Sequence, residues 1–296
     1  MRIKRSILLI ILSVISFLGL AQQPEDKINK ETLTYKDTLQ LDFYSIEKFQ
    51  SSVQPLLILV HGGGFASGKR DGKNEIEFSR KMAKKGYAVA SISYRLTRKN
   101  DVFNCDCATE KKINSFVDGA EDLADVIVFL SAQTSLQFNR NKIVLIGSSA
   151  GAEIVLHLAF MHDDYRFKHL APISIAGVIS FSGAMIDASY INETNAVPSL
   201  FIHGKKDKLV PYETAAHHFC STDKDGYLML DGPVTITDRL KKLKTSYFLA
   251  YDPEGGHEWA NKAYQETDLV QKFIHDIILE NKVSNSSFER KTVKLH

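Results

Sequence analysis

The stretch KIVLIGSSAGAEIVLHL, from Lys142 to Leu158, constrains the fold more than any other part of this 296-residue chain. Ile143 to Ile146 is a short β-branched run, which is typical of a buried strand. Ile154 to Leu158 places apolar residues on one face of a helix, and five small residues, Gly147 to Gly151, lie between the two segments. A strand, a sharp turn and a helix together predict a nucleophile elbow, in which the turn forces its middle residue into a strained backbone conformation above the sheet.

The two glycines of this turn decide which serine is central. A Cβ atom at Gly147 or Gly151 would crowd the turn and the close packing of the strand against the helix. The residue midway between them is Ser149, so we predict that Ser149 is the nucleophile and that Ser148 is not.

Hydrophobic patterns along the rest of the chain predict strands that alternate with helices, which indicates the α/β class with a mostly parallel sheet covered on both faces. An antiparallel hairpin is expected first, at Thr32–Ile46. We expect further strands at Leu56–Val60, Tyr87–Tyr94, Ile143–Ile146, Ile173–Phe181, Ser199–His203 and Thr245–Tyr251, and helices at Asn74–Lys85, Ile113–Leu130 and Tyr264–Leu279. Residues 22–283 are predicted to form one domain, and residues 284–296 a flexible polar tail.

Each distinctive motif follows directly after a predicted strand. His61-Gly62-Gly63-Gly64, Ser149, Asp207 and His257 are far apart in the sequence, yet all lie at such strand ends. Ligands of parallel sheets bind beyond the carboxyl ends of the strands. We therefore expect these residues to meet at one edge of the sheet.

A serine hydroxyl needs a base within hydrogen-bond reach before it can act as a nucleophile at neutral pH. Among the ten histidines, His257 is the strongest candidate because it follows Gly255-Gly256 in a loop after the last strand. In one group of hydrolases the catalytic serine comes first in the sequence, the acid second and the histidine last. The late position of His257 fits this order. His203 is expected to be hydrogen-bonded locally, and His61 belongs to the glycine turn.

The histidine also needs a carboxylate that holds its tautomer and stabilises its charged form. Asp207, within HGKKDKLVP, lies between Ser149 and His257 in the sequence and is our predicted acid. Asp252 and Glu254 are alternatives because they are close to His257 along the chain, but they would share its loop.

Backbone N–H groups must also stabilise the oxyanion that forms when a carbonyl is attacked. We predict that the amides of Gly63, Gly64 and Ala150 fill this role, because glycines permit close approach and Ala150 begins a helix. A phosphate-binding loop is the alternative for a glycine-rich turn, but GxGxxG spacing and a Gly-Lys-Ser/Thr sequence are both missing.

The N-terminus has the pattern of an export signal. Arg2, Lys4 and Arg5 precede an apolar run from Ser6 to Leu20, and small residues end at Ala21. This run is short for a membrane-spanning helix, which needs about 20 residues. We expect cleavage of residues 1–21, export to the periplasm or the medium, and no stable membrane anchor; an uncleaved anchor is the alternative.

Charge and cysteine content narrow the function further. A net charge of +2 does not favour nucleic acid as a partner. An oxidising compartment permits a disulfide between Cys220 and either Cys105 or Cys107. The CxC pair has no second pair at zinc spacing, so no metal site is predicted.

Several motifs match one known superfamily over the stretch from Leu33 to Leu279. These motifs are His61-Gly62-Gly63-Gly64-Phe65, Ser93-Tyr94-Arg95-Leu96, Gly147-Ser148-Ser149-Ala150-Gly151, His203-Gly204 with Asp207 and Val210-Pro211, and Gly256-His257. On these residues the chain resembles the α/β-hydrolase superfamily, specifically its HGGG-bearing esterases and lipases. The resemblance implies an eight-stranded sheet with an antiparallel second strand, no metal and no organic cofactor. It also implies the same nucleophile, acid, base and oxyanion donors.

The branch similar to hormone-sensitive lipase usually reads Gly-Asp-Ser-Ala-Gly-Gly, whereas this chain has Ser148 and Ala152 at the second and last positions. Only about 35 residues separate Ala21 from the HGGG strand, too few for that branch's helical cap. The chain is therefore more similar to capless carboxylesterases, which include secreted enzymes that remove acetyl or feruloyl groups from plant polysaccharides.

We thus predict a secreted serine carboxylic-ester hydrolase with a small-molecule or polysaccharide ester as substrate. A serine peptidase, a lipid or polyester hydrolase and an inactive binding scaffold are the alternatives. Phe65 is a candidate wall of the acyl pocket, or equally a core aromatic residue. The segments Asp101–Glu110 and Phe219–Val234 are expected to line the mouth of the site.

Overall fold

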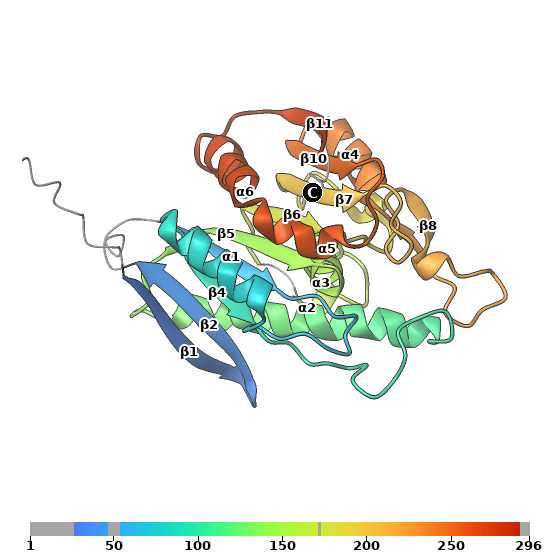
Figure 1. Cartoon of the computed structure of the whole chain (residues 1–296), viewed down its shortest axis with the longest axis horizontal. Coiled ribbons are helices and arrows are strands. Elements are labelled where there is room, and N and C mark those ends of the chain that lie inside the picture. Colours follow the sequence, from blue (N-terminus) through green and yellow to red (C-terminus); the bar gives the residue numbers. More distant parts are fainter. Residues whose placement is uncertain (1–26, 47–53, 171–172, 291–296) are drawn as a thin grey trace, which may run out of the picture.

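The computed structural model describes residues 27–46, 54–170 and 173–290. The predicted export signal, residues 1–21, lies outside them. Within the described residues, the main sheet has nine strands in the order β1-β2-β4-β3-β5-β6-β7-β10-β11 (Figure 1). These strands are β1 (Ile28–Lys36), β2 (Leu39–Ile46), β3 (Pro55–Val60), β4 (Ala88–Ile92), β5 (Asn139–Ser148), β6 (Gly177–Phe181), β7 (Ser199–Gly204), β10 (Tyr247–Asp252) and β11 (Asn285–Glu289).

Strand direction follows the predicted pattern. The hairpin of β1 and β2 is antiparallel, β2 is also antiparallel to β4, and each later pair in the sheet is parallel. The carboxyl ends of β3, β5, β7 and β10 therefore meet at one edge of the sheet, as the positions of the motifs required.

Helices cover both faces of the sheet (Figure 1). The buried residues of α1 (Lys73–Lys84), α5 (Trp259–Lys262) and α6 (Thr267–Phe273) pack on one face, and those of α2 (Thr109–Ala132), α3 (Ala150–Phe160) and α4 (Pro233–Lys242) pack on the other. Strand β3 shows why both faces are apolar. Leu56 and Ile58 belong to the core under α2, α3 and α4, whereas Leu57 and Leu59 belong to the core under α1, α5 and α6. An unbroken apolar run therefore fills two cores.

Shorter elements complete the described structure. The small antiparallel sheet of β8 (Thr214–Ala216) and β9 (Met229–Asp231) precedes α4, and α6 continues as a π-helix over Ile274–Leu279. Short 3₁₀ turns occur at Lys168–Leu170, Ala188–Tyr190, His217–Phe219 and Ala263–Gln265. The sequence did not predict α4 or this small sheet; β8 and β9 have only three residues each, too few to show a periodic pattern.

The C-terminal region differs from its prediction. Residues 285–289 were expected to belong to a flexible tail, but they form β11, which pairs in parallel with β10. Phe288 packs against Phe248, with ring centroids 6.2 Å apart, and its neighbours in the strand are exposed or half-buried. One apolar residue in a polar edge strand gives little periodicity, so the pattern was too weak to read. The sheet consequently has nine strands instead of eight.

In the part of the chain that the structure describes, every helix is too short or too polar to cross a membrane.

Candidate active site

The predicted elbow is present between β5 and α3. Ser149 has a φ of 51°, the left-handed conformation that non-glycine residues rarely adopt. Its N–H donates to the carbonyl oxygen of Phe181 on the neighbouring strand, at 2.8 Å. A Cβ atom on Gly147 would lie 2.1 Å from the Gly151 carbonyl oxygen, and one on Gly151 would lie 2.3 Å from the Val60 carbonyl oxygen. Both glycines are therefore required by close backbone contacts.

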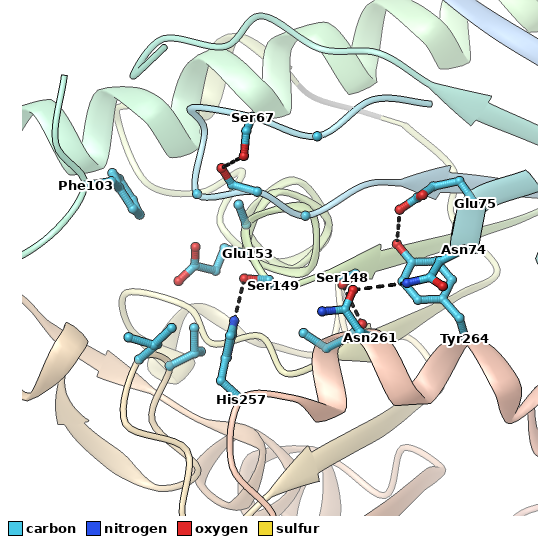
Figure 2. A pocket seen from close by; sticks show the side chains of 18 of the residues that line it. Ser67, Asn74, Glu75, Phe103, Ser148, Ser149, Glu153, His257, Asn261 and Tyr264 are labelled. Atoms are coloured by element: carbon cyan, nitrogen blue, oxygen red, sulfur yellow. Dashed lines mark hydrogen bonds between the residues drawn. The ribbon is translucent and has the colours of Figure 1, made fainter. Parts of the chain in front are cut away.

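Three predicted side chains form one hydrogen-bonded chain. The Ser149 Oγ lies 2.9 Å from the Nε2 atom of His257, and the Nδ1 atom of the same ring lies 2.7 Å from the Oδ2 atom of Asp207. Figure 2 shows His257 pointing at Ser149 inside the cavity. This geometry allows the imidazole to take a proton from the hydroxyl while its other nitrogen is held by a carboxylate.

Asp207 is buried but well supplied with donors. Its Oδ1 accepts hydrogen bonds from the backbone N–H groups of Leu209 and Val210, at 2.8 and 3.0 Å. The Nε2 atom of His203 lies 3.3 Å from Oδ2 and 3.1 Å from the carbonyl oxygen of Val210. Burial alone would raise the pKa of Asp207, but the contacts with His203 and His257 outweigh it and hold this pKa well below its usual value. The acid is therefore ionised and can orient the histidine.

The alternative acids have other partners. Asp252 accepts hydrogen bonds from the indole N–H of Trp259 at 2.9 Å and from the backbone N–H of Glu254 at 3.0 Å. The Glu254 carboxylate pairs with Lys206. The structure thus brings Asp207, and neither alternative, to the ring of His257.

Ser148 and His61 also have local partners. The Ser148 hydroxyl is buried and donates to the carbonyl oxygen of Ala260 at 2.8 Å. The Nδ1 atom of His61 lies 2.7 Å from the carbonyl oxygen of Gly62, and burial lowers the pKa of His61 to about 4. Both residues support the turns around Ser149 instead of contacting its hydroxyl.

The glycine turn lies beside the serine. Gly63 and Gly64 have φ angles of 117° and 60°, and both line the cavity together with Ala150. Across the described residues, the backbone N–H groups of Gly63, Gly64 and Ala150 have no acceptor. The Gly63 carbonyl oxygen, by contrast, accepts from the backbone N–H groups of Ala66 and Ser67, which fixes the turn. Unpaired amides next to a serine hydroxyl are the arrangement that an oxyanion needs.

Comparisons with known proteins agree with this geometry. The BD-FAE family model matches residues 41–186, which contain the glycine turn and the elbow. Esterase 2 of the planctomycete Thermogutta terrifontis, solved with bound butyrate, is 17% identical, covers 84% of this chain and 94% of its own, and superposes with a TM-score of 0.58.

Two further solved structures have the same fold. MGS-M1, an α/β-hydrolase enzyme from a Medee basin deep-sea metagenome library, is 16% identical with a TM-score of 0.59 and covers 86% of this chain and 99% of its own. Esterase B of Lactobacillus rhamnosis is also 16% identical, with a TM-score of 0.56 and coverage of 87% and 88%. The chain has the α/β-hydrolase fold. No curated protein matches its sequence.

The α/β-hydrolase site opens into a cavity of about 530 Å³ that extends to both sides of Ser149 (Figure 2). We call one side the Glu153 side; it is lined by Phe103, Glu153, His217 and His218. The opposite side, the Tyr264 side, is lined by Asn74, Glu75, Asn261 and Tyr264. Of these side chains, the sequence predicted only Phe103 near the site, through the segment Asp101–Glu110. Glu153 did give a signal, since it is a single acid on an apolar helix, one turn after the nucleophile.

Phe65 does not line this cavity; of its two predicted roles, the structure shows the core aromatic residue. Its side chain is fully buried and packs against Tyr94, Phe103 and Phe116, with ring centroids 4.8 to 6.1 Å apart. The reason is its backbone, because a φ of 57° directly after the glycine turn directs the ring into the core. Phe103 lies in front of it and takes the predicted position.

A disulfide joins the two loops that were expected near the mouth. Cys105 is bonded to Cys220, and Cys107 is a buried free thiol. Phe103 from the first loop lines the cavity as expected. Among the described residues, the second loop contributes His217 and His218, which precede the predicted stretch Phe219–Val234. The prediction is therefore confirmed for the first segment through Phe103 and wrong for Phe219–Val234, none of whose residues lines the cavity.

Among the described residues, no cluster of three or more histidine, cysteine or acidic side chains is arranged to hold a metal ion.

Proposed function

We propose that this chain is a serine carboxylesterase that hydrolyses its substrate through an acyl-enzyme. The observation that carries the proposal is the hydrogen-bonded chain Ser149–His257–Asp207 beside three backbone amides without acceptors. Similarity in fold to solved esterases supports it.

The mechanism follows from the positions of the side chains. The Nε2 atom of His257 takes the Ser149 proton as Oγ attacks the ester carbonyl carbon, and the amides of Gly63, Gly64 and Ala150 stabilise the oxyanion. The protonated ring then gives its proton to the departing alcohol. Water, activated by the same histidine, attacks the acyl-enzyme, and the acid is released.

We further propose small acyl esters or acetyl and feruloyl esters of polysaccharides as substrates, since the chain is similar to capless esterases and its cavity extends to both sides of Ser149. Esters from acetate to decanoate, acetylated xylan and methyl ferulate form the panel that tests this. Faster cleavage of dipeptide amides than of esters would instead favour a peptidase, and a preference for insoluble esters would favour a lipid or polyester hydrolase.

A fluorophosphonate probe tests the nucleophile directly. We expect covalent labelling of the folded wild type and of Ser148→Ala, and no labelling of Ser149→Ala. Ser148→Ala is a matched control because it removes the neighbouring hydroxyl, which is bonded to the Ala260 carbonyl oxygen. An unlabelled wild type would indicate an inactive binding scaffold.

Export is part of the proposal and rests on residues 1–21. The disulfide between Cys105 and Cys220 supports it, because such bonds persist in oxidising compartments. Sequencing the N-terminus of the protein recovered from the periplasm or the medium tests it. We expect a start near Gln22; a retained Met1 would contradict cleavage.

A further inference from the structure

Each side of the cavity has one glutamate, and the two glutamates differ in the hydrogen bonds that they accept. On the Tyr264 side, the Tyr264 hydroxyl donates to the Glu75 Oε1 at 2.7 Å, and Asn74 donates to Asn261 at 3.1 Å. On the Glu153 side, the Oε1 atom of Glu153 has no hydrogen-bond partner in the described structure, although the residue is only 1% exposed. Figure 2 shows its carboxyl group inside the cavity, close to Ser149.

His217 beside it is equally unsatisfied. This residue is 1% exposed, and within the described residues its Nδ1 atom has no partner. Its Nε2 atom lies 3.3 Å from the Glu153 Oε1 without forming a hydrogen bond of good geometry. Two buried polar groups that line one cavity and lack partners cost free energy, and such groups in a native structure require an explanation.

Within the described residues, the neighbouring groups have other contacts. Lys112 lowers the pKa of Glu153, but its ammonium donates to the Gly226 carbonyl oxygen at 2.6 Å, and Lys112 is not among the residues that line the cavity. Phe103 and His218, the other residues of this side, contact His217 through their rings. The missing partner therefore has to enter through the cavity.

Both groups are uncharged near neutral pH. Burial raises the pKa of Glu153 to about 8, an effect that His257 and Lys112 oppose. Burial also lowers the pKa of His217 to about 3. A neutral carboxylic acid both donates and accepts a hydrogen bond, and so does a neutral imidazole. This pair suits an uncharged polar group better than an anion or a cation.

We propose that Glu153 and His217 bind a hydroxyl group of the ester substrate. A hydroxyl has one donor and two acceptor positions, so it can bond to both side chains at once. The inference rests on the proposed esterase function and makes its substrate more specific. Glu153 lies four residues after Ser149, about 6 Å along the helix axis, so the hydroxyl lies a few bonds from the ester carbonyl.

Four esters test this by pH-stat measurement of kcat/KM. Ethyl butyrate is the reference, ethyl 3-hydroxybutyrate carries the hydroxyl on the acyl side, and 2-hydroxyethyl butyrate carries it on the alcohol side. Ethyl 3-aminobutyrate replaces the hydroxyl by an ammonium group. We expect wild type to prefer one of the two hydroxy esters over ethyl butyrate by about tenfold or more, because the plain ester leaves both buried groups unpaired.

Variants then test whether Glu153 and His217 cause this preference for a hydroxy ester. Glu153→Leu should reduce the hydroxy-to-plain ratio to about one, whereas Glu153→Gln, which keeps a donor and an acceptor, should retain most of it. Glu75→Gln on the Tyr264 side is the matched control and should retain the wild-type ratio. His217→Phe gives a second, independent removal if Glu153→Leu does not fold.

Several results would overturn the inference. They are a wild-type ratio of one or less for both hydroxy esters, a preference for the amino ester, or an unchanged ratio in Glu153→Leu or in His217→Phe. If Ser149 is labelled and ethyl butyrate is cleaved while the ratio is one, this inference fails and the esterase function stands. If Ser149 is not labelled, the esterase function itself fails.

Discussion

Asp207 and Glu153 both bury a carboxyl group near His257, and their surroundings leave them in opposite states. The segment after β7 folds back so that the N–H groups of Leu209 and Val210 and the ring of His257 all donate to Asp207. The Glu153 Oε1 has no such donor in the described structure. The pKa of Asp207 is accordingly lowered, and burial raises that of Glu153 to about 8.

The difference teaches that burial alone does not decide the charge of a carboxyl group. Both side chains are almost completely inaccessible to solvent. Burial penalises the charged form in each case, and only direct hydrogen bonds to the carboxylate reverse that penalty. An ionised acid behind His257 and an acid of raised pKa in the cavity wall can therefore occur within one site.

The largest expected effect comes from Asp207→Asn, which removes the charge that holds His257. We expect kcat to fall by about 10³- to 10⁴-fold, because the amide favours the wrong tautomer of the ring. Asp252→Asn is the matched control, and its main effect should be on stability through the bond to Trp259. Steady-state kinetics on an aryl acetate measure both. An equal fall of kcat in the two variants would contradict the assignment of Asp207 as the acid that orients His257.

The second effect tests the neutral state of Glu153 through stability. Its pKa is about 8 in the folded protein against an ordinary value of 4.5. The folded state thus binds the proton more tightly, so stability is highest below about pH 4.5 and falls as pH rises towards 8. Glu153→Gln lacks this titration. Relative to the variant, wild type should lose on the order of 3–4 kcal/mol between pH 5 and pH 8.

Urea midpoints of the two proteins at several pH values between 5 and 9 provide this measurement. A stability difference that stays constant across this range would show that Glu153 is already ionised, and the contrast with Asp207 would disappear.

A smaller effect is expected from the disulfide, which supports only the Glu153 side. Cys105 and Cys220 close a loop with a sequence separation of 115 residues and join the segments that carry Phe103 and His217. The double variant Cys105→Ser/Cys220→Ser should lose about 2–4 kcal/mol of unfolding free energy. Its hydroxy-ester preference should weaken while hydrolysis of ethyl butyrate changes by only a fewfold. Equal losses on both esters would mean that the disulfide supports the whole site.

The smallest effect on kcat is expected when one of the groups that contact the Asp207 carboxylate is removed. His203→Gln removes the ring nitrogen that lies 3.3 Å from Oδ2, but the two backbone N–H groups and His257 remain. We expect kcat to fall by no more than about tenfold, equivalent to roughly 1.4 kcal/mol. A loss as large as that of Asp207→Asn would show that His203 is indispensable for keeping the acid ionised.

Local backbone requirements made much of the fold and site predictable. Gly147 and Gly151 identified Ser149, and the alternation of strands with helices placed Asp207 and His257 at the same edge of the sheet. These features depend on short-range sterics and on chain order, both of which are written in the sequence.

The remaining features depend on contacts between distant segments. Nothing near Phe65 in the sequence states that Phe103, 38 positions later, would cover its ring. His217 lies 3.3 Å from Glu153 although 64 positions separate the two residues in the sequence. Strand β11 pairs along its whole length with β10, and Phe288 packs on Phe248. Pattern reading could not have found these, because each is decided by three-dimensional packing.

The contact between Gly151 and the carbonyl oxygens of Val60 and His61 has a consequence for protein engineering. The nucleophile and the glycine turn press against each other through main-chain atoms, with no side chain between them that could be trimmed or exchanged. Neither can be shifted without displacing the other. Attempts to redesign this enzyme should therefore leave the turn and the elbow together as one rigid unit and alter substrate choice from the cavity walls.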